Sequence, residues 1–290
     1  MKTILPSNFG CYVSSSGGLF KILERSHELC IKTVMTHPVP PQKWNTKSFD
    51  EKVVKDFFSS PFYYPDINIF FHSIYLVNLA TLNNKNYHLS KLSILNHLDL
   101  LLKIKGKSVV FHPGSFKDVI NENDGFLRIA NAINWVFSNL TIEPTPNCLL
   151  IECSAGSGRI VGAKIDDLMK IYELIDEKYK AYVGFCLDTQ HLFASGYDLV
   201  NKLDEVVQEI KSKLINDKIV LIHLNDSKSS LGSCLDRHED LGKGFIGING
   251  LRRIINNYFF KNKFVVLETP SLGSLEGSRA ELDTLLSILD

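Results

Sequence analysis

The sequence predicts an α/β protein whose eight parallel strands close into a (β/α)8 TIM barrel, with a metal site at the C-terminal rim. Three observations predict it. Short apolar runs recur along the chain, a segment of helical period follows each run, and no linker or low-complexity tract interrupts the 290 residues. Eight such units in roughly 250–300 residues fit a closed barrel better than an open doubly wound sheet. We therefore expect residues 1–290 to form a single catalytic domain.

The expected strands are nearly continuous apolar runs, as parallel strands covered on both faces must be. They are residues 8–13, 30–37, 67–71, 108–112, 148–153, 182–187, 218–224 and 263–268. The helical segments between them include residues 49–60, 89–104, 126–140 and 165–179, where apolar residues recur every three or four positions.

Composition excludes several classes of protein. Hydrophobic residues make up 44% of the chain and charged residues 22%, which excludes a disordered chain, a fibrous repeat and a disulfide scaffold. Lys and Arg number 32, as do Asp and Glu, so any basic patch that binds nucleic acid has to be local. The first ten residues lack the apolar core of a leader peptide, and residues 67–82 are too short and polar to span a bilayer.

Six cysteines occur without a C-x-x-C pair, and five of them lie within the expected strands. This usage indicates buried, reduced thiols in a reducing compartment. The cysteines are Cys11, Cys30, Cys148, Cys153, Cys186 and Cys234.

Side chains that can ligate a metal end six of the eight expected strands. In a barrel all these ends face one rim, which is where active sites of this fold lie. Counting the residues that follow closely in the adjoining loops, the set is His72, His112, Glu152, Asp188, His191, His223, Asp236, His238 and Glu268.

A single histidine after an apolar run is more often a structural residue, and His27, His37, His88 and His97 keep that interpretation. The nine candidate ligands taken together need another explanation. Their four carboxylates would lie on one rim, where they repel one another and lose hydration unless countercharges are present. No matching set of Lys and Arg lies at these strand ends. A divalent metal supplies the countercharge, and mixed His, Asp and Glu ligation favours Zn²⁺.

The number of ligands indicates more than one ion. Nine ligands are too many for one tetrahedral site and fit two or three ions. Three Zn²⁺ ions with four carboxylates leave a net charge of about +2, which suits a hydroxide and a phosphate diester. Metal clusters support in-line displacement at phosphorus, so the chemistry predicts hydrolysis of a phosphate ester.

The motifs themselves resemble the endonuclease IV family of zinc-dependent abasic-site nucleases, also called family 2 of the AP endonucleases. The resemblance is carried by FHPGS at 111–115, GFCLDTQHLFASGYDL at 184–199, HLNDSKSSLGSCLDRHEDLGKG at 223–244 and VVLET at 265–269. HSIYLVNL at 72–79, IECSAGSG at 151–158 and VSSSGGL at 13–19 also fit, so the match extends from residue 9 to residue 270. D-T-x-H, H-L-N-D-x-K and D-R-H in that order are specific to the family.

The resemblance implies a trinuclear zinc site, with Mn²⁺ able to occupy one position. The first ion would be held by His72, His112 and Glu152, and Glu152 would bridge to a second ion shared with Asp188, His223 and Glu268. The third ion would be held by His191, Asp236 and His238. All nine family positions carry the expected residue type, which argues against an inactive relative.

The family's activity is the expectation for this chain. It cleaves double-stranded DNA 5′ to an abasic site, leaving a 3′-hydroxyl and a 5′-deoxyribose phosphate, and trims blocked 3′ ends as a phosphodiesterase or phosphatase. A metal-activated hydroxide, oriented by Glu152, would attack the phosphorus in line. The abasic nucleotide is flipped out of the helix, which costs least where no base pair has to be broken.

The expected DNA contacts rest partly on the resemblance and partly on local charge. Tyr75 matches a family aromatic that packs near the extruded sugar, and a core tyrosine is the alternative. Gly17 and Gly18 would let a phosphate approach the first strand-to-helix turn. A turn that needs glycine for its backbone alone explains the pair equally well. Phosphate contacts are further expected from Lys228, Ser229 and Arg237.

Two departures from the family pattern bear on these expectations. Tyr12 stands where the family usually has His, so we assign it no metal role. The proline-rich loop 37–45 has Gln42, with Lys43 beside it, where the family presents an Arg that enters the DNA stack. This places abasic-site selectivity in question.

Two other functions remain open from the residues. A divalent-metal sugar isomerase or epimerase of the related barrel superfamily would not need His191, Asp236 and His238. A non-catalytic binder of damaged DNA would have lost Glu152. We expect a monomer without membrane association, in the bacterial cytoplasm at the nucleoid, or in a nucleus or virion if the source is not bacterial.

Overall fold

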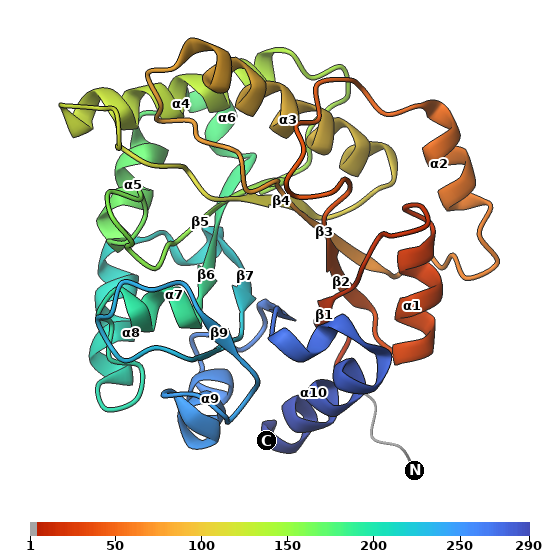
Figure 1. Ribbon diagram of the computed structural model, residues 1–290, viewed down its shortest axis with the longest axis vertical. Helices are drawn as coiled ribbons and strands as arrows, with labels where there is room; N and C mark the ends of the chain where they lie inside the picture. Colours follow the sequence, from red (N-terminus) through yellow and green to blue (C-terminus); the bar gives the residue numbers. More distant parts are fainter. Residues whose placement is uncertain (1–4) are drawn as a thin grey trace.

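Eight parallel strands close into a barrel in the computed structural model, which describes residues 5–290 (Figure 1). The strands are β1 (Phe9–Tyr12), β2 (Thr33–Thr36), β3 (Asn68–His72), β4 (Ser108–Phe111), β5 (Leu149–Glu152), β6 (Val183–Asp188), β7 (Ile219–His223) and β10 (Phe264–Leu267). Because β1 pairs with both β2 and β10, the sheet has no free edge. The predicted TIM barrel is confirmed. The leader-peptide expectation falls partly on residues 1–4, outside the described residues.

Helices surround the barrel in Figure 1. They are α1 (Lys21–Leu29), α2 (Glu51–Phe58), α3 (Asn84–Lys103), α4 (Glu122–Ser138), α5 (Ile165–Glu173), α6 (Glu177–Lys180), α7 (Thr189–Ala194), α8 (Leu203–Lys213), α9 (Gly247–Asn256) and α10 (Leu275–Ile288), with 3₁₀ turns at Asn216–Lys218 and Pro270–Gly273. No helix of residues 5–290 is long and apolar enough to cross a membrane.

Three predicted boundaries were wrong for identifiable reasons. The strand predicted over 30–37 begins only at Thr33, because Cys30 ends α1 in the left-handed conformation with φ of 56° and its side chain is exposed. The helix predicted over 89–104 begins five residues earlier, where the Asn83 side chain accepts from the Asn86 N–H and caps it. The segment 165–179 is broken at Asp176, whose backbone is extended with ψ of 134°.

Cysteine burial also differs from the expectation at two positions. Cys30 and Cys234 are exposed, whereas the other four cysteines are buried. Cys234 lies in an irregular loop with φ of 56°, where no apolar run marks it as core. All six are free thiols.

A short antiparallel pair outside the barrel was not predicted. Strands β8 (Asp226–Ser227) and β9 (His238–Glu239) have only two residues each, too few for a period to be visible in the sequence. They join the segment after β7 to the loop that carries Asp236 and His238.

The barrel interior is filled by one layer of apolar side chains, distinct from the larger core between strands and helices. Seven strands contribute one residue each to this layer. The residues are Met35, Phe70, Val110, Leu150, Cys186, Leu221 and Val266. The interior is therefore packed rather than open, and the next residues facing inward lie at the rims.

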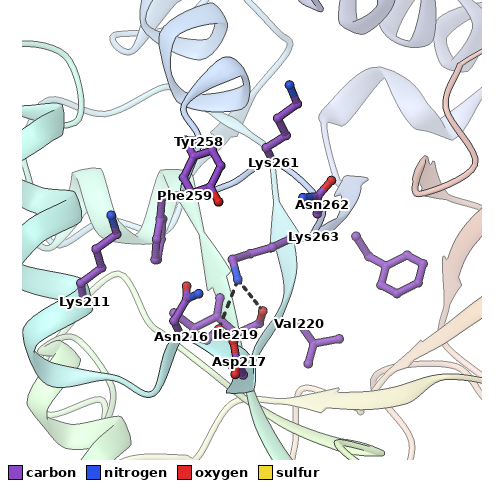
Figure 2. A pocket seen from close by; sticks show the side chains of 11 residues that line it. Lys211, Asn216, Asp217, Ile219, Val220, Tyr258, Phe259, Lys261, Asn262 and Lys263 are labelled. Carbon is purple, nitrogen blue, oxygen red and sulfur yellow. Dashed lines mark hydrogen bonds between the residues drawn. The ribbon is translucent and has the colours of Figure 1, made fainter.

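A cavity of about 390 Å³ lies at the barrel end where the strands begin. Among its lining residues, Lys263 donates from Nζ to the carbonyls of Asn216 at 3.2 Å and Ile219 at 2.9 Å (Figure 2). The ammonium is thus held by backbone oxygens. None of the groups of metal-type ligands found among residues 5–290 lies at this end.

Candidate metal centre

The C-terminal rim carries a ring of eight side chains, one from each strand or the residue just beyond it. Each lies two positions after a residue of the interior layer, or after Gly10 in β1, so the alternation of strand side chains points it to the same side of the sheet. The members of this rim ring are Tyr12, His37, His72, His112, Glu152, Asp188, His223 and Glu268. Six of them are predicted ligands.

Glu152 lies at the centre of the predicted ligands and is completely buried. Its Oε2 is 3.1 Å from His72 Nε2 and 3.4 Å from His112 Nε2. Its Oε1 is 2.8 Å from His223 Nδ1 and 3.5 Å from His191 Nδ1. The two oxygens therefore face two different sets of imidazoles, which is the geometry of a bridging carboxylate.

Four groups of donor atoms lie close enough to share an ion, each with all atoms within 4.8 Å of one another. Two match the predicted first and second ions, and a third joins Asp188 to His191 and His238. A fourth adds Cys186, which sequence reasoning did not single out. The groups are His72–His112–Glu152, Glu152–Asp188–His223–Glu268, Asp188–His191–His238 and Glu152–Cys186–His223.

Asp236 reaches this centre from the loop that follows β8. Its Oδ2 is 3.4 Å from His191 Nε2, and its Oδ1 is 3.5 Å from His238 Nε2. The structure thus brings together the trio predicted for the third ion. Asp188 lies beside this trio, with its Oδ2 at 3.7 Å from His238 Nε2.

Hydrogen bonds fix which nitrogen of three imidazoles faces the centre. Since a backbone carbonyl only accepts, His72 donates from Nδ1 to Ser73 O at 2.7 Å and His191 from Nδ1 to Cys153 O at 3.1 Å. His238 donates from Nδ1 to the carbonyl after β10 at 3.2 Å. Each therefore presents Nε2 as a ligand, and a carbonyl that holds the other ring nitrogen is typical of metal-binding histidines.

The electrostatics favour ionised carboxylates beside these imidazoles. Burial alone would raise the pKa of Glu152, but the charges of His112 and His223 hold that pKa well below its usual range. For Glu268, the neighbouring His223 outweighs burial and lowers the pKa to about 2. Burial lowers the pKa of His112.

These donors fit divalent metal ions. His238 Nε2 is buried and has no hydrogen-bond partner among residues 5–290, although it faces the carboxylates of Asp188 and Asp236. A buried nitrogen without a partner is costly in a folded protein, and a metal ion between these groups would use its lone pair. The donor set of imidazoles and carboxylates suits Zn²⁺.

Asn225 is a supporting residue that sequence reasoning missed, although it lies within the H-L-N-D motif. It is completely buried, donates from Nδ2 to Asp188 Oδ2 at 2.7 Å and accepts from the Glu268 backbone N–H at 2.8 Å. One amide side chain thus orients a ligand of β6 and fixes the backbone of a ligand after β10.

His37 and Tyr12 complete the rim ring beside the predicted ligands. His37 donates from Nδ1 to the His72 carbonyl at 3.0 Å, and its ring centroid is 5.2 Å from that of His72 and 5.6 Å from that of Tyr12. Burial lowers the pKa of His37 to about 4. Among residues 5–290, neither belongs to a group of donor atoms close enough to share an ion.

The predicted DNA contacts lie in different environments. Tyr75 is 65% exposed at the rim, its ring 5.2 Å from that of His37. Ser229 is buried, and its hydroxyl donates to the Leu235 carbonyl at 3.0 Å, so it stabilises its own loop. The exposed members of the set are Gly17, Gly18, Gln42, Lys43, Lys228 and Arg237.

A cavity of about 330 Å³ opens beside the predicted metal centre. Its lining includes the predicted ligands His112 and Asp236, together with Tyr75, Ala155 and Ile160. It is smaller than the cavity at the opposite end, but it alone of the two adjoins the predicted ligands.

The fold and the site together define a metal-binding barrel of the xylose isomerase-like class. The family model described as "Xylose isomerase-like TIM barrel" matches residues 23–288. Within that class, the chain is 36% identical over 267 residues to "Probable endonuclease 4" of Buchnera aphidicola subspecies Baizongia pistaciae, covering 90% of this chain and 93% of the relative. It is 33% identical over 273 residues to "Apurinic-apyrimidinic endonuclease 1" of Plasmodium berghei, covering 91% of this chain and 51% of that relative.

Among solved structures, endonuclease IV from Thermus thermophilus superposes with a TM-score of 0.82 at 25% identity, covering 97% of this chain and 98% of that one. The chain belongs to the endonuclease IV family. It is a nuclease, and the sequence-based assignment to a hydrolase is confirmed.

Proposed function

We propose that this protein is a DNA-repair endonuclease that hydrolyses the phosphodiester 5′ to an abasic site and also trims blocked 3′ ends. The observation that carries the proposal is the meeting of all nine predicted ligands at one rim, with Glu152 between the first two sets of imidazoles. The name of the Plasmodium berghei relative, "Apurinic-apyrimidinic endonuclease 1", supplies the abasic substrate. Residues 1–290 would act as one catalytic unit and as a monomer.

Three Zn²⁺ ions are proposed for the three ligand sets, with Mn²⁺ able to take one position. Such ions, when bound, acidify water and stabilise a leaving oxygen in phosphate-ester hydrolysis. His191, Asp236 and His238 would hold the third ion, which a sugar isomerase or epimerase with one or two ions does not need. Their mutual approach to within 3.4–3.5 Å through Asp236 favours the nuclease over the isomerase.

The residues of the chain position the reacting groups. Both oxygens of Glu152 face imidazole nitrogens and the carboxylate is completely buried, so it is held in place and would orient the attacking water. Asp188 is fixed by the N–H groups of Gln190 and His191 at its Oδ1 and by Asn225 at its Oδ2. Water attacks phosphorus as the P–O3′ bond breaks, giving a 3′-hydroxyl and a 5′-phosphate.

The DNA contacts are proposed from exposure and place. The cavity next to His112 and Asp236 would receive the extruded abasic sugar, and Tyr75 at its edge would pack against it. Lys228 and Arg237, both exposed on the loop after β7, would contact phosphates. Gly17 and Gly18, with φ of 90° and 121°, would let a phosphate approach the backbone.

The test uses a labelled duplex that contains one tetrahydrofuran abasic analogue, which resists β-elimination. We expect the zinc-loaded protein to leave a 3′-hydroxyl, a chelator to abolish incision and added zinc to restore it. Glu152→Gln should lower the rate by at least about 100-fold, since even loss of a residue that only supports a metal ligand costs roughly 10–100-fold. The control is Glu143→Gln, the same substitution at an exposed position.

Three outcomes would contradict the proposal. If zinc-replete protein neither binds nor cuts the DNA, a sugar isomerase is favoured. If the protein binds the DNA without cutting it, a damage-binding module is favoured. Full activity in Glu152→Gln would remove the role assigned to that carboxylate.

A further inference from the structure

A buried carboxylate lies at the base of the loop that delivers the third set of ligands. Asp226 of β8 is 0% exposed, and it precedes the rim loop, which we define as residues 228–247. Within residues 5–290, every hydrogen bond accepted by its oxygens comes from a backbone N–H. The donors are Ser227 at 2.7 Å, Gly242 at 3.0 Å, Gly244 at 3.0 Å, Ile246 at 2.9 Å and Gly247 at 3.1 Å and 3.2 Å.

The end of the rim loop is shaped to wrap around this carboxylate. Gly242 and Gly247 have φ of 80° and 70°, in the region that side chains disfavour. A Cβ on Gly244 would lie 2.5 Å from Asp226 Oδ1 and 2.3 Å from the Ser227 carbonyl. Only glycine therefore allows the backbone to approach so closely, and the N–H groups form a concave anion site that the carboxylate fills.

The carboxylate anchors the C-terminal end of the rim loop, whose middle is held separately where the Gly232 and Cys234 N–H groups donate to the Phe193 and Ala194 carbonyls. Strands β8 and β9 contribute two residues each, with Ser227 opposite His238, and so short an antiparallel pair is marginal without other contacts. The chain leaves Asp226, carries Asp236 and His238 across the rim and then returns to the Asp226 oxygens. Asp236 itself is 56% exposed at its side chain, so packing does not fix it.

We propose that Asp226 is a positioning residue that holds Asp236 and His238 beside His191 for the third metal ion. Its charge-assisted hydrogen bonds anchor the return of the rim loop, and the β8–β9 pairing transmits that anchor to His238. The inference rests on the three-ion site of the proposed function. It predicts that the third ion depends on a residue that does not ligate it.

The test compares Asp226→Asn with two further variants. The asparagine keeps the shape but turns an NH₂ group toward backbone N–H donors, which removes acceptors without creating a cavity. Gly244→Ala moves the loop away from an intact carboxylate and serves as the second variant. The matched control is Asp198→Asn, since Asp198 accepts from the backbone N–H groups of Val200 and Asn201 in the loop after α7.

Zinc is the first probe. Ion count by native mass spectrometry and competitive zinc titration should show the weakest-bound zinc about 10–100-fold weaker in Asp226→Asn and Gly244→Ala, with the other ions retained. Asp198→Asn should match the parent. Unchanged melting temperature in a variant that loses one ion separates positioning from general destabilisation.

Proteolysis is the second probe and does not depend on the number of ions. Arg237 is exposed within the rim loop, so an arginine-specific protease should cut there faster in both variants, relative to cutting at Arg279. Equal zinc affinity with equal cleavage would overturn the proposal. If the parent protein binds fewer than three ions, the three-ion site of the proposed function is wrong. The comparison of cleavage at Arg237, made on the proteins as purified, still decides whether Asp226 holds the rim loop.

Discussion

His97, in the middle of α3, is buried without a hydrogen-bond partner, and its replacement should stabilise the protein. Its side chain is 0% exposed, and neither ring nitrogen has a partner among residues 5–290. The nearby ring of Phe49, with centroids 6.3 Å apart, offers no acceptor. His97→Leu keeps a similar volume and removes two unsatisfied polar atoms, so we expect a gain of about 1–2 kcal/mol at pH 7.5.

The gain should increase as the pH falls. Burial, together with the charges of His37 and His72, lowers the pKa of His97 to about 3 from 6.5. Below pH 6.5 the unfolded chain therefore binds a proton that the folded chain does not, and folding loses stability. At pH 5 the loss is about 2 kcal/mol, from 1.36 kcal/mol for each tenfold difference in protonation. His97→Leu avoids this loss.

The assay is urea unfolding followed by circular dichroism at pH 7.5 and pH 5, with equal zinc in all samples. The quantity compared is the difference in free energy of unfolding between variant and parent, so that other titrating groups cancel. His88→Leu, at an exposed position of the same helix, is the control and should show no pH-dependent gain. A His97→Leu protein that is less stable at pH 7.5, or whose advantage does not grow at pH 5, would refute the reasoning.

The other predictions concern the site and the barrel closure. Asn225→Leu should lower zinc affinity by about 10–100-fold, because Asp188 loses the amide that orients its Oδ2. An unchanged affinity in a zinc titration would contradict this prediction. Gly10→Ala should prevent normal folding, because its Cβ would lie 1.6 Å from the Thr33 carbonyl oxygen, whereas Gly273→Ala has no atom within 4 Å and should leave soluble yield and melting temperature intact.

Much of the candidate site could be read from strand ends. Glu152, Asp188 and His223 each end a strand two residues after an inward apolar residue, so the period of two places them on the rim once the barrel is recognised. The same rule applies to His37 and Tyr12, which alternation places in the rim ring although nothing in their sequence context marks them as ligands.

Other features depend on contacts between distant segments. The sharing of Asp188 with His191 and His238 needs the rim loop to return from β9, and the two-residue pair β8–β9 leaves no period in the sequence. The role of Asp226 depends on backbone N–H groups 16–21 residues later in the chain. No local propensity encodes such an encounter.

The sequence by itself determined the barrel, the order of its strands and the identity of the ligand types at their ends. These follow from periodicity and from chemistry at positions close together in the chain. Tertiary structure alone decided which nitrogen His191 and His238 present, how Glu152 divides its oxygens between two sets of ligands and what holds the rim loop. These features depend on contacts between residues 16 to 80 positions apart, which exist only after the barrel has closed.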